Sequence, residues 1–404
     1  MALYSEKVAE EAIKKALQDY YEKAGIAYNH TQVPDCESCG PLLRTRRMKA
    51  LIAMSGGVDS SLAAKLMLDQ GYDCIGCTMK LYQNEDAGID RSHTCCSLED
   101  VEDARSVAYK LGIPYYVFNF TDAFHDLVIR KFVESYQNGI TPNPCIDCNR
   151  YMKFDKLYMR ARILGCDYLV TGHYARIEEQ DGKFLLKKAL DETKDQSYVL
   201  YSMTQEQLAH TKFPLGNLRK AEVRQIAKQN GFGNADKPDS QDICFVPNGD
   251  YGSVIQLHAK DAQATGNFVD KQGNVLGQHR GIIHYTIGQR RGLGISASEP
   301  LYVCGISPQS GDIVLGRECD LFCREAEIAD FNWISGDVPH NGFSCKAKIR
   351  YRQQEQSAYC TPIGNSRVRI AFEKPQRAIT PGQAAVLYDG DIVLGGGTIV
   401  SSGT

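Results

Sequence analysis

Residues 51–61 read LIAMSGGVDSS, and this stretch decides the fold of the domain around it. The apolar run at its start is typical of a short buried strand, which leads directly into Ser55-Gly56-Gly57. We expect a helix to open at about Ser60. Two glycines let the backbone come close to an anion, and the N–H groups of the loop and helix then point at phosphate oxygens. The stretch therefore predicts a phosphate-binding loop.

The loop is not of the common kind that ends in Gly-Lys-Ser or Gly-Lys-Thr, because no lysine stands at the required place. It carries Asp59 instead. A carboxylate beside ATP would be repelled unless a magnesium ion stood between them, so Asp59 is expected on the metal side of a bound nucleotide. The alternative is an ordinary glycine-rich turn. The strand before, the helix after and the flanking serines favour phosphate binding.

Short apolar strands and helical segments alternate after the loop, which predicts a doubly wound α/β domain with a parallel sheet over residues 48–210. Residues 211–277 are predicted to form a small mixed central domain. Residues 278–404 contain short alternating runs separated by Gly, Pro and Asn, so they predict an antiparallel β-barrel. Residues 1–47 are an extension of unknown role, with a helix expected over residues 5–24.

Composition sets limits on the class of protein. Hydrophobic residues make up 43% of the 404 and charged residues 24%, which is ordinary for a globular protein. No apolar run approaches the roughly 20 residues of a membrane span, and no secretory signal begins the chain, so a cytoplasmic protein without a membrane partner is expected. The 15 cysteines are then expected to be thiols. Most, such as Cys74, Cys77 and Cys166, should be buried.

The net charge of −3 argues against bulk affinity for nucleic acid, so such a partner would need local basic patches. Between His340 and Arg377 there are eight Lys or Arg residues against two Glu. The turn GQRRGLG at residues 288–294 is also basic. These patches suit contacts to an RNA backbone, although a merely solvated barrel face would have a similar composition.

The stretch TPNPCIDCNRYMKF, residues 141–154, sets Cys145 and Cys148 in a C-x-x-C pattern. Such a pair suits a zinc half-site, a redox dithiol, part of an iron–sulfur site or two unrelated thiols. Cys36 and Cys39 form a second C-x-x-C pair without a partner pair at zinc spacing, and Cys95 and Cys96 lie too close together to chelate easily and are expected in a loop near the nucleotide. No metal is assigned to either pair.

Eight motifs in the same order resemble the tRNA-specific 2-thiouridylase family along nearly the whole chain from Met48. The loop SGGVDSS matches the loop S-G-G-x-D-S of enzymes that cleave ATP between the α and β phosphates. The other seven are TPNPCIDCN (141–149), TGHYAR (171–176), KDQSYVLY (194–201), SQDICF (240–245), HYTIGQRRGLGI (284–295), KIRYR (348–352) and ITPGQAAVLY (379–388).

The resemblance implies an enzyme that replaces the 2-oxygen of the wobble uridine of certain tRNAs with sulfur. ATP would adenylate that oxygen, and a sulfur nucleophile would then expel AMP. The partners would be tRNA and a sulfur donor, either a cysteine desulfurase, a sulfur carrier or inorganic sulfide. The target base must be splayed out of the anticodon stack, as loops permit.

The resemblance also implies roles for individual residues. The residues that would hold ATP are Ala53, Met54, Ser55, Gly56, Gly57, Val58, Asp59, Ser60, Met79 and Gly172. Those that would face the target base are Asn143, Pro144 and Cys145. Those that would contact tRNA elsewhere are His173, Lys194, Asp195, Gln196, Arg350, Tyr351 and Gln383. On its own, His173 would be interpreted as a structural histidine, and Arg350 and Tyr351 as an ordinary strand pair.

In this resemblance Cys148 is the nucleophile and Cys244 the carrier of a persulfide. Arg150 and Lys153 would favour the thiolate that attack requires. The best-known members of the family have an aspartate at the position of Cys145. Three cysteines, Cys145, Cys148 and Cys244, resemble instead the site of related tRNA thiolases that hold a 4Fe–4S cluster with one iron free to bind sulfide. Both the persulfide and the cluster mechanism are open at this point, with the cluster preferred on ligand count.

Two other functions are compatible with the loop alone. An amide synthetase would use the same adenylating loop, but the chain has no glutaminase-like half. A non-catalytic RNA-binding protein with a cysteine-bound metal would need the basic barrel but would not turn over a nucleotide.

Overall fold

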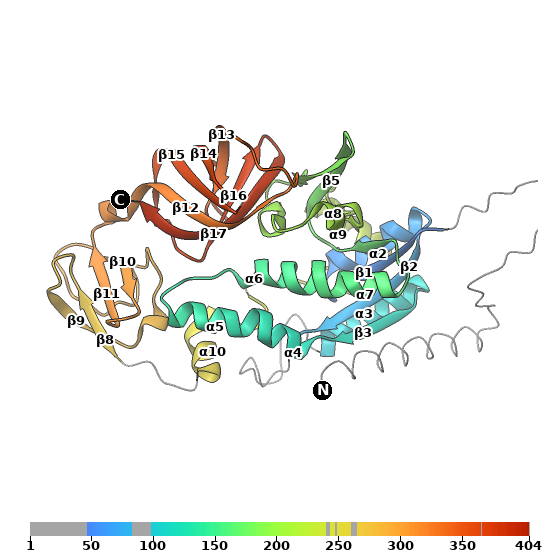
Figure 1. The fold of residues 1–404 in the computed structure, drawn as a ribbon. Coiled ribbons are helices and arrows are strands. Elements are labelled where there is room, and N and C mark those ends of the chain that lie inside the picture. The colour runs from blue at the N-terminus through green and yellow to red at the C-terminus, as the bar shows by residue number, and fades with distance from the viewer. Residues whose placement is uncertain are drawn as a thin grey trace, which may run out of the picture. The chain divides into compact units, whose positions relative to one another are not determined.

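The computed structural model describes residues 47–82, 98–239, 243–246, 249–259, 265–364 and 366–403. The helix expected over residues 5–24 and the pairs Cys36/Cys39 and Cys95/Cys96 lie outside these residues. Three sheets organise the described part of the chain (Figure 1). None of its helices has the length and apolar character needed to cross a bilayer.

The phosphate loop follows the middle strand of a five-stranded parallel sheet, so the predicted doubly wound α/β fold is confirmed. The strand order is β3-β2-β1-β4-β7, and every neighbouring pair is parallel. The strands are β1 (Lys49–Ala53), β2 (Asp73–Lys80), β3 (Tyr115–Asn119), β4 (Tyr168–Val170) and β7 (Thr211–Lys212).

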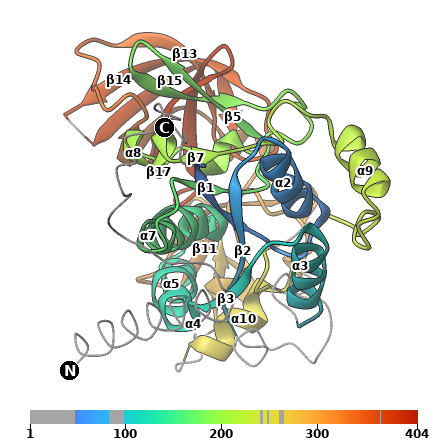
Figure 2. The same ribbon diagram turned by 90° about the vertical axis from the view of Figure 1, so that its right-hand side faces the viewer.

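Helices cover both faces of this sheet, because successive residues of β1 point to opposite sides. Ala50 and Ile52 pack into one core and Leu51 into the other, and all three are fully buried. In Figure 2, α2 and α3 lie on one side of the sheet and α5 and α7 on the other. These helices are α2 (Val58–Asp69), α3 (Leu98–Leu111), α5 (Arg130–Gln137) and α7 (Tyr158–Ile163).

Two longer helices are built from consecutive segments with a π-helical part. The first joins α4 (Thr121–Phe124) and η2 (His125–Ile129) to α5, and the second joins α6 (Pro144–Asp147) and η3 (Cys148–Leu157) to α7. The sequence explains where the second one begins. Asn143 is its N-cap and accepts a hydrogen bond from Cys145 N at 3.2 Å, while Pro144 occupies the first helical position. Cys148 opens the π-helical part, a feature often found at functional sites.

The remaining short elements connect the sheets. They are the hairpin β5 (Ala175–Gln180) and β6 (Lys183–Lys188), with η4 (Ser197–Leu200), α8 (Gln205–Ala209), α9 (Lys220–Gln229) and α10 (Tyr251–His258).

The second sheet has four strands in the order β10-β11-β8-β9. They are β8 (Gly266–Val269), β9 (Val275–His279), β10 (Tyr302–Ser307) and β11 (Asp312–Gly316), with η6 (Ile282–His284) between the two halves. The boundary expected between residues 277 and 278 therefore falls inside β9. Residues 278–316 pair with the central strands rather than with the barrel.

The C-terminal strands form the predicted antiparallel barrel, which the β12–β17 pairing closes with six strands. After η7 (Glu318–Leu321) they are β12 (Phe322–Trp333), β13 (Phe343–Lys348), β14 (Gln356–Ile363), β15 (Arg367–Arg377), β16 (Ala384–Asp389) and β17 (Ile392–Gly403). The hairpin β5–β6 extends this sheet, since Lys187 of β6 pairs with Ile392. β13 ends at Lys348, so Arg350 and Tyr351 are not the strand pair that they would be taken for on their own.

Candidate active site

The loops after β1 and β4 meet at one edge of the parallel sheet. The chain proceeds from β1 to β2 and β3 on one side and to β4 and β7 on the other, so the strand order reverses between β1 and β4. Open α/β sheets bind ligands in the crevice at the carboxyl ends of the strands at such a reversal. Three residues of the predicted ATP set reach this edge. Ala53 ends β1, Met79 is next to last in β2, and Gly172 follows β4.

Serine hydroxyls hold the phosphate loop in shape. Ser55 N donates to Ser60 Oγ at 3.1 Å, and the hydroxyls of Ser60 and Ser61 donate to the Gly57 carbonyl at 3.1 and 3.0 Å. These bonds tie the loop to the first turn of α2. The loop therefore has a defined conformation before any nucleotide binds.

Position 56 requires glycine, whereas a side chain at position 57 would find free space. Gly56 has φ of +77°, and a Cβ there would overlap the backbone of Asp100 in the first turns of α3. At Gly57 a Cβ would meet only Ser55 Oγ, at 3.6 Å. Asn234 supports the crowded side of the loop, at Gly56, by donating to the Gly56 carbonyl at 2.8 Å. The side at Gly57 has free space and is therefore the one available to phosphate oxygens.

Gly172 fixes the distance between the β4 loop and the phosphate loop. A Cβ at this position would lie 2.8 Å from Ser60 N and 2.9 Å from the carbonyl carbon of Asp59. Only a residue without a side chain lets the two backbones come this close. This contact explains why Gly172, far from the loop in sequence, belongs with the predicted ATP residues.

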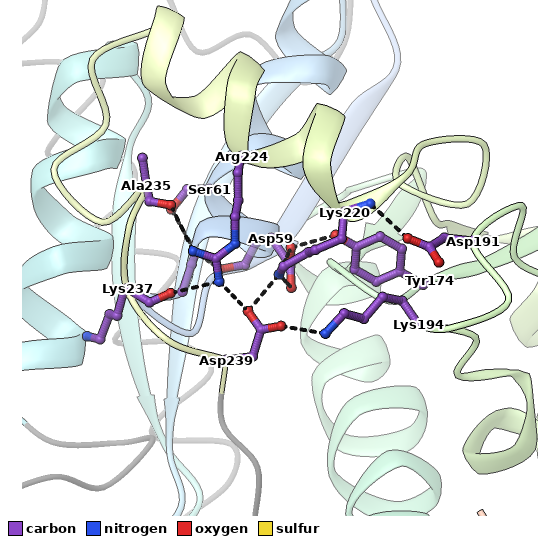
Figure 3. Close-up of polar contacts among 12 residues, drawn as sticks. Asp59, Ser61, Tyr174, Asp191, Lys194, Lys220, Arg224, Ala235, Lys237 and Asp239 are labelled. Carbon is purple, nitrogen blue, oxygen red and sulfur yellow. Dashed lines mark hydrogen bonds and ion pairs between the residues drawn. The ribbon is translucent and has the colours of Figure 1, made fainter. Parts of the chain in front are cut away.

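The carboxylate of Asp59 is held by two side chains from outside the loop (Figure 3). Tyr174 donates its hydroxyl to Asp59 Oδ1 at 2.8 Å. The ammonium of Lys220 contacts both carboxylate oxygens, at 2.7 and 2.8 Å. A carboxylate in this place fits the preference of magnesium for oxygen ligands shared with nucleotide phosphates.

The same lysine joins Asp59 to a second carboxylate, Asp239. Lys220 Nζ lies 2.8 Å from Asp239 Oδ1, and Lys194 and Arg224 contact Asp239 at 2.8 and 3.0 Å. Burial alone would raise the pKa of Asp239, but hydrogen bonds from Lys194 and Lys220 lower it to about 2. Asp239 is therefore ionised at any physiological pH.

His173 is a buried, neutral histidine that connects the segment after β4 to the helix formed by α6, η3 and α7. This helix carries Cys145 and Cys148 and is called the cysteine helix below. Burial and the nearby charge of Lys153 hold its pKa well below 6.5. Lys153 Nζ lies 3.3 Å from His173 Nε2, and since an ammonium only donates, Nε2 is the acceptor. Nδ1 then carries the proton and donates to Thr171 Oγ1 at 2.6 Å. The place of His173 among the tRNA contacts stays a prediction.

Lys153 also acts on Cys148, which begins the π-helical segment η3. Burial raises the pKa of the Cys148 thiol, Lys153 lowers it, and Asp147 raises it, with a net increase. Lys153 therefore favours the thiolate, as expected, but burial outweighs its effect on the Cys148 pKa. Asp147 itself is buried and pairs with Lys131 at 2.6 Å.

Cys145, Cys148 and Cys244 differ in their surroundings. Cys145 is exposed, whereas Cys148 and Cys244 are half-buried and pack against the same core cluster. Tyr82 donates its hydroxyl to the Cys244 carbonyl at 2.6 Å. In the part of the chain that the structure describes, no three His, Cys, Asp or Glu residues come close enough to hold a metal ion. The iron–sulfur cluster on Cys145, Cys148 and Cys244 stays a prediction.

Cys74, Cys77 and Cys166 are buried, as predicted. Burial raises the pKa of Cys74 to about 12 and that of Cys166 to about 11, so these thiols are unreactive at neutral pH.

The predicted tRNA residues fall into two groups. Lys194, Asp195 and Gln196 make internal bonds, since Lys194 pairs with Asp239, Asp195 accepts from Ser197 Oγ at 2.8 Å, and Gln196 accepts from Tyr174 N at 2.9 Å. The barrel residues form the second group. They are Arg350, Tyr351 and Gln383.

The turn after β13 brings barrel residues toward the cysteine helix. The pKa of Tyr351 is raised by burial and by the charges of Asp195 and Cys145, so its hydroxyl lies near both. Arg350 is bent back to donate to the Ala378 carbonyl at 2.9 Å. The structure thus brings together three predicted residues from distant motifs, which are Cys145, Asp195 and Tyr351.

A second contact joins the barrel to the loop in front of Pro144. Gln383 Nε2 donates to the carbonyls of Thr141 and Pro142, at 2.9 and 3.3 Å. Gly382 has φ of +88°, and a Cβ there would lie against Ile140. The barrel therefore supports the segment that presents Asn143, Pro144 and Cys145.

Sequence reasoning missed Lys220, Tyr174 and Asn234, which touch the phosphate loop or its aspartate, and Asp239, which pairs with Lys220. Lys220 lies in RKAEVRQIAKQNG, which predicts only a helix. It contacts a carboxylate 161 residues away in the chain, so no local pattern points to it. A lysine at the first position of a helix, next to the positive end of the helix dipole, was the one available signal.

Three family models match consecutive parts of this chain. Models described as tRNA methyl transferase HUP domain, tRNA methyl transferase PRC-barrel domain and Aminomethyltransferase beta-barrel domain match residues 48–248, 254–317 and 323–399. A solved structure of a 4-thiouridine synthetase–RNA complex with bound ATP is similar only in part, at 18% identity and a TM-score of 0.31 over 52% of this chain and 50% of that chain.

The curated relatives match far more closely. The tRNA-specific 2-thiouridylase MnmA of Clostridioides difficile (strain 630) is 51% identical over 356 residues, which cover 88% of this chain and 98% of that protein. The protein of the same name from Clostridium acetobutylicum is 50% identical over 351 residues, covering 87% and 99%. The chain therefore belongs to the tRNA-specific 2-thiouridylase family.

Proposed function

We propose that this protein adenylates the 2-oxygen of the wobble uridine of certain tRNAs with ATP and then replaces that oxygen with sulfur. The observation that carries the proposal is a continuous set of contacts from the phosphate loop to a thiol. Gly172 lies against the loop, and His173, the next residue, contacts Lys153, whose charge acts on Cys148. ATP cleavage and sulfur chemistry would thus share one edge of the sheet.

In the adenylation step the uridine 2-oxygen attacks the α-phosphorus of ATP, and pyrophosphate leaves. The loop N–H groups and the start of α2 would bind the phosphates. Magnesium would be held by Asp59 and would neutralise part of the triphosphate charge. Met79 and Gly172 border the same edge, where the adenosine would lie.

In the sulfur step the outer sulfur of a persulfide on Cys244 attacks C2 of the base, and AMP leaves with the former 2-oxygen. The Cys148 thiolate then attacks the inner sulfur, Sγ of Cys244. This releases 2-thiouridine and leaves a Cys148–Cys244 disulfide, which a dithiol reductant must reduce. A cysteine desulfurase or a sulfur carrier would supply the persulfide.

The proposal uses the persulfide route and not an iron–sulfur cluster, because Cys148 and Cys244 pack against the same core cluster while Cys145 is exposed. Cys145 is exposed and near Tyr351, so it suits a contact with the extruded base or its neighbours. The tRNA backbone would contact the basic turn, where Arg290 and Arg291 are exposed, and Arg377 on the barrel.

The test uses protein purified without oxygen, an unmodified tRNA transcript, ATP and a persulfide-loaded donor. AMP release and 2-thiouridine are measured together, with iron content determined on the same samples. We expect iron-free protein to be fully active, Cys148→Ser to lose more than 100-fold of the thiolation while releasing AMP, and Cys145→Asp to keep activity. Cys319→Ser, at an exposed cysteine of η7, is the matched control.

Two results would contradict the proposal in different ways. Activity with inorganic sulfide that tracks iron content would replace the persulfide route with a cluster. Absence of tRNA-dependent AMP formation would overturn the function itself.

A further inference from the structure

The phosphate loop of this chain has no lysine of its own, yet a lysine ammonium lies at its edge. Lys220, at the start of α9, places Nζ within 2.8 Å of both oxygens of Asp59, in the first turn of α2 (Figure 3). The first turn of α2 is the end whose N–H groups face the phosphate site.

The position of Lys220 requires negative charge close to its ammonium. It is the first residue of α9, where the helix dipole disfavours a cation. Its side chain is only 11% exposed, so most of its hydration has been removed. Its ammonium lies 5.7 Å from the ring of Tyr174, which compensates for part of that loss. The two carboxylates, Asp59 and Asp239, provide the rest.

The charges around Lys220 are balanced. Lys194, Lys220 and Arg224 contribute three positive charges, and Asp59, Asp239 and Asp191, which accepts from Lys220 N at 2.9 Å, contribute three negative ones. When ATP binds, Asp59 is needed on the magnesium side, and Asp239 keeps Lys194 and Arg224 as partners. Lys220 can therefore move away from Asp59 and Asp239 while each of these carboxylates keeps a positively charged partner.

We propose that Lys220 is the phosphate-binding lysine of this site. In the nucleotide-free protein its ammonium rests between Asp59 and Asp239. With ATP bound, it contacts oxygens of the β and γ phosphates, the part that leaves as pyrophosphate, and stabilises the charge that develops there. The inference rests on the proposed function only in taking ATP as the substrate.

The test measures the affinities of magnesium pyrophosphate, α,β-methylene-ATP and AMP by calorimetry, without tRNA. We expect Lys220→Gln to bind pyrophosphate and the ATP analogue about 10- to 100-fold more weakly, the loss typical of one hydrogen bond between charged groups. AMP, which lacks both phosphates, should bind as in the wild type. Lys220→Arg should recover most of the pyrophosphate affinity, because a guanidinium also pairs with phosphate.

Lys228→Gln is the control, since Lys228 lies on the same helix and pairs with Asp236 at 2.7 Å but contacts no part of the loop among the described residues. Thermal unfolding shows whether each variant is folded. Equal loss of AMP and pyrophosphate binding in Lys220→Gln, or no loss of either, would overturn the inference. Wild-type protein that binds neither ATP analogue nor pyrophosphate would instead overturn the proposed function.

Discussion

Cys148 shows how burial and charge compete at a single thiol. Burial raises its pKa most, Lys153 lowers it and Asp147 raises it again. The thiol is therefore mostly protonated at neutral pH, which protects it from oxidation while no substrate is present. Lys153 is the neighbour whose charge favours the thiolate, and it is also the residue that contacts His173.

The pH dependence of Cys148 reactivity follows from these signs. The thiolate forms as the pH rises through the pKa, so alkylation by iodoacetamide should still be increasing above pH 8. Removal of the Lys153 charge in Lys153→Met should raise the pKa further. Below the pKa, each unit of that increase reduces the thiolate fraction about tenfold. Mass spectrometry of the Cys148 peptide measures the rate between pH 6 and 10.

Lys156→Met is the matched control for this measurement, because Lys156 is exposed on the same helix and does not contribute to the Cys148 pKa. Its profile should equal that of the wild type. A Lys153→Met profile that coincides with the wild type, or moves to lower pH, would show that Lys153 does not stabilise the thiolate.

At the scale of elements, the site depends on how closely two strand-to-helix connections approach each other. The loop after β1 and the segment after β4 are separated by more than 100 residues in sequence, yet Gly172 touches the backbone of Asp59 and Ser60. Parallel pairing of β1 with β4 produces this meeting, since it brings both carboxyl ends to one edge.

We expect Gly172→Ala to weaken ATP binding roughly tenfold or more, since the added Cβ would push α2 away from the β4 loop. The dissociation constant for α,β-methylene-ATP, measured by calorimetry, gives the result. Gly233→Ala is the control, because a Cβ there meets nothing within 4 Å and its φ is not positive. Equal affinities for the two variants would mean that the close approach is not needed for nucleotide binding.

Most elements could be predicted from sequence, because their periodicity and their end signals agree. Gly71 and Gly165 end α2 and α7 with positive φ, and Asn143-Pro144 begins α6. Arg350 and Tyr351 could not be placed in this way. Their alternating pattern fits a strand, but β13 ends at Lys348 and Arg350 donates to the Ala378 carbonyl.

For the whole molecule, the sequence predicted three kinds of sheet but not how segments are shared between them. The hairpin β5–β6 lies within the predicted nucleotide domain, yet it pairs with β17 of the barrel. Roles for the thiol, loop and base-facing residues could be proposed from the sequence because family motifs contain them. Lys220 and Asp239 could not, because each acts through a partner far away in the chain.

The barrel contacts the TPNP loop, residues 141–144, and we expect this contact to matter for the reaction with tRNA but not for the binding of ATP. Gly382→Ala would place a methyl group against Ile140 and 2.9 Å from the Thr141 carbonyl, which would displace the segment leading to Asn143. We expect kcat/KM for tRNA to fall about tenfold. The affinity for α,β-methylene-ATP should stay within twofold, since none of these residues borders the phosphate loop.

The control for Gly382→Ala must carry the same backbone strain without the contact, and Gly390→Ala meets this condition. Gly390 lies in the turn between β16 and β17 with φ of +58°, and a Cβ there meets nothing within 4 Å. Both substitutions therefore cost about 1–2 kcal/mol of strain, which thermal unfolding would report. Only Gly382→Ala should also reduce tRNA thiolation. If both variants lose it equally, strain in the barrel accounts for the effect, and the TPNP loop does not depend on Gly382.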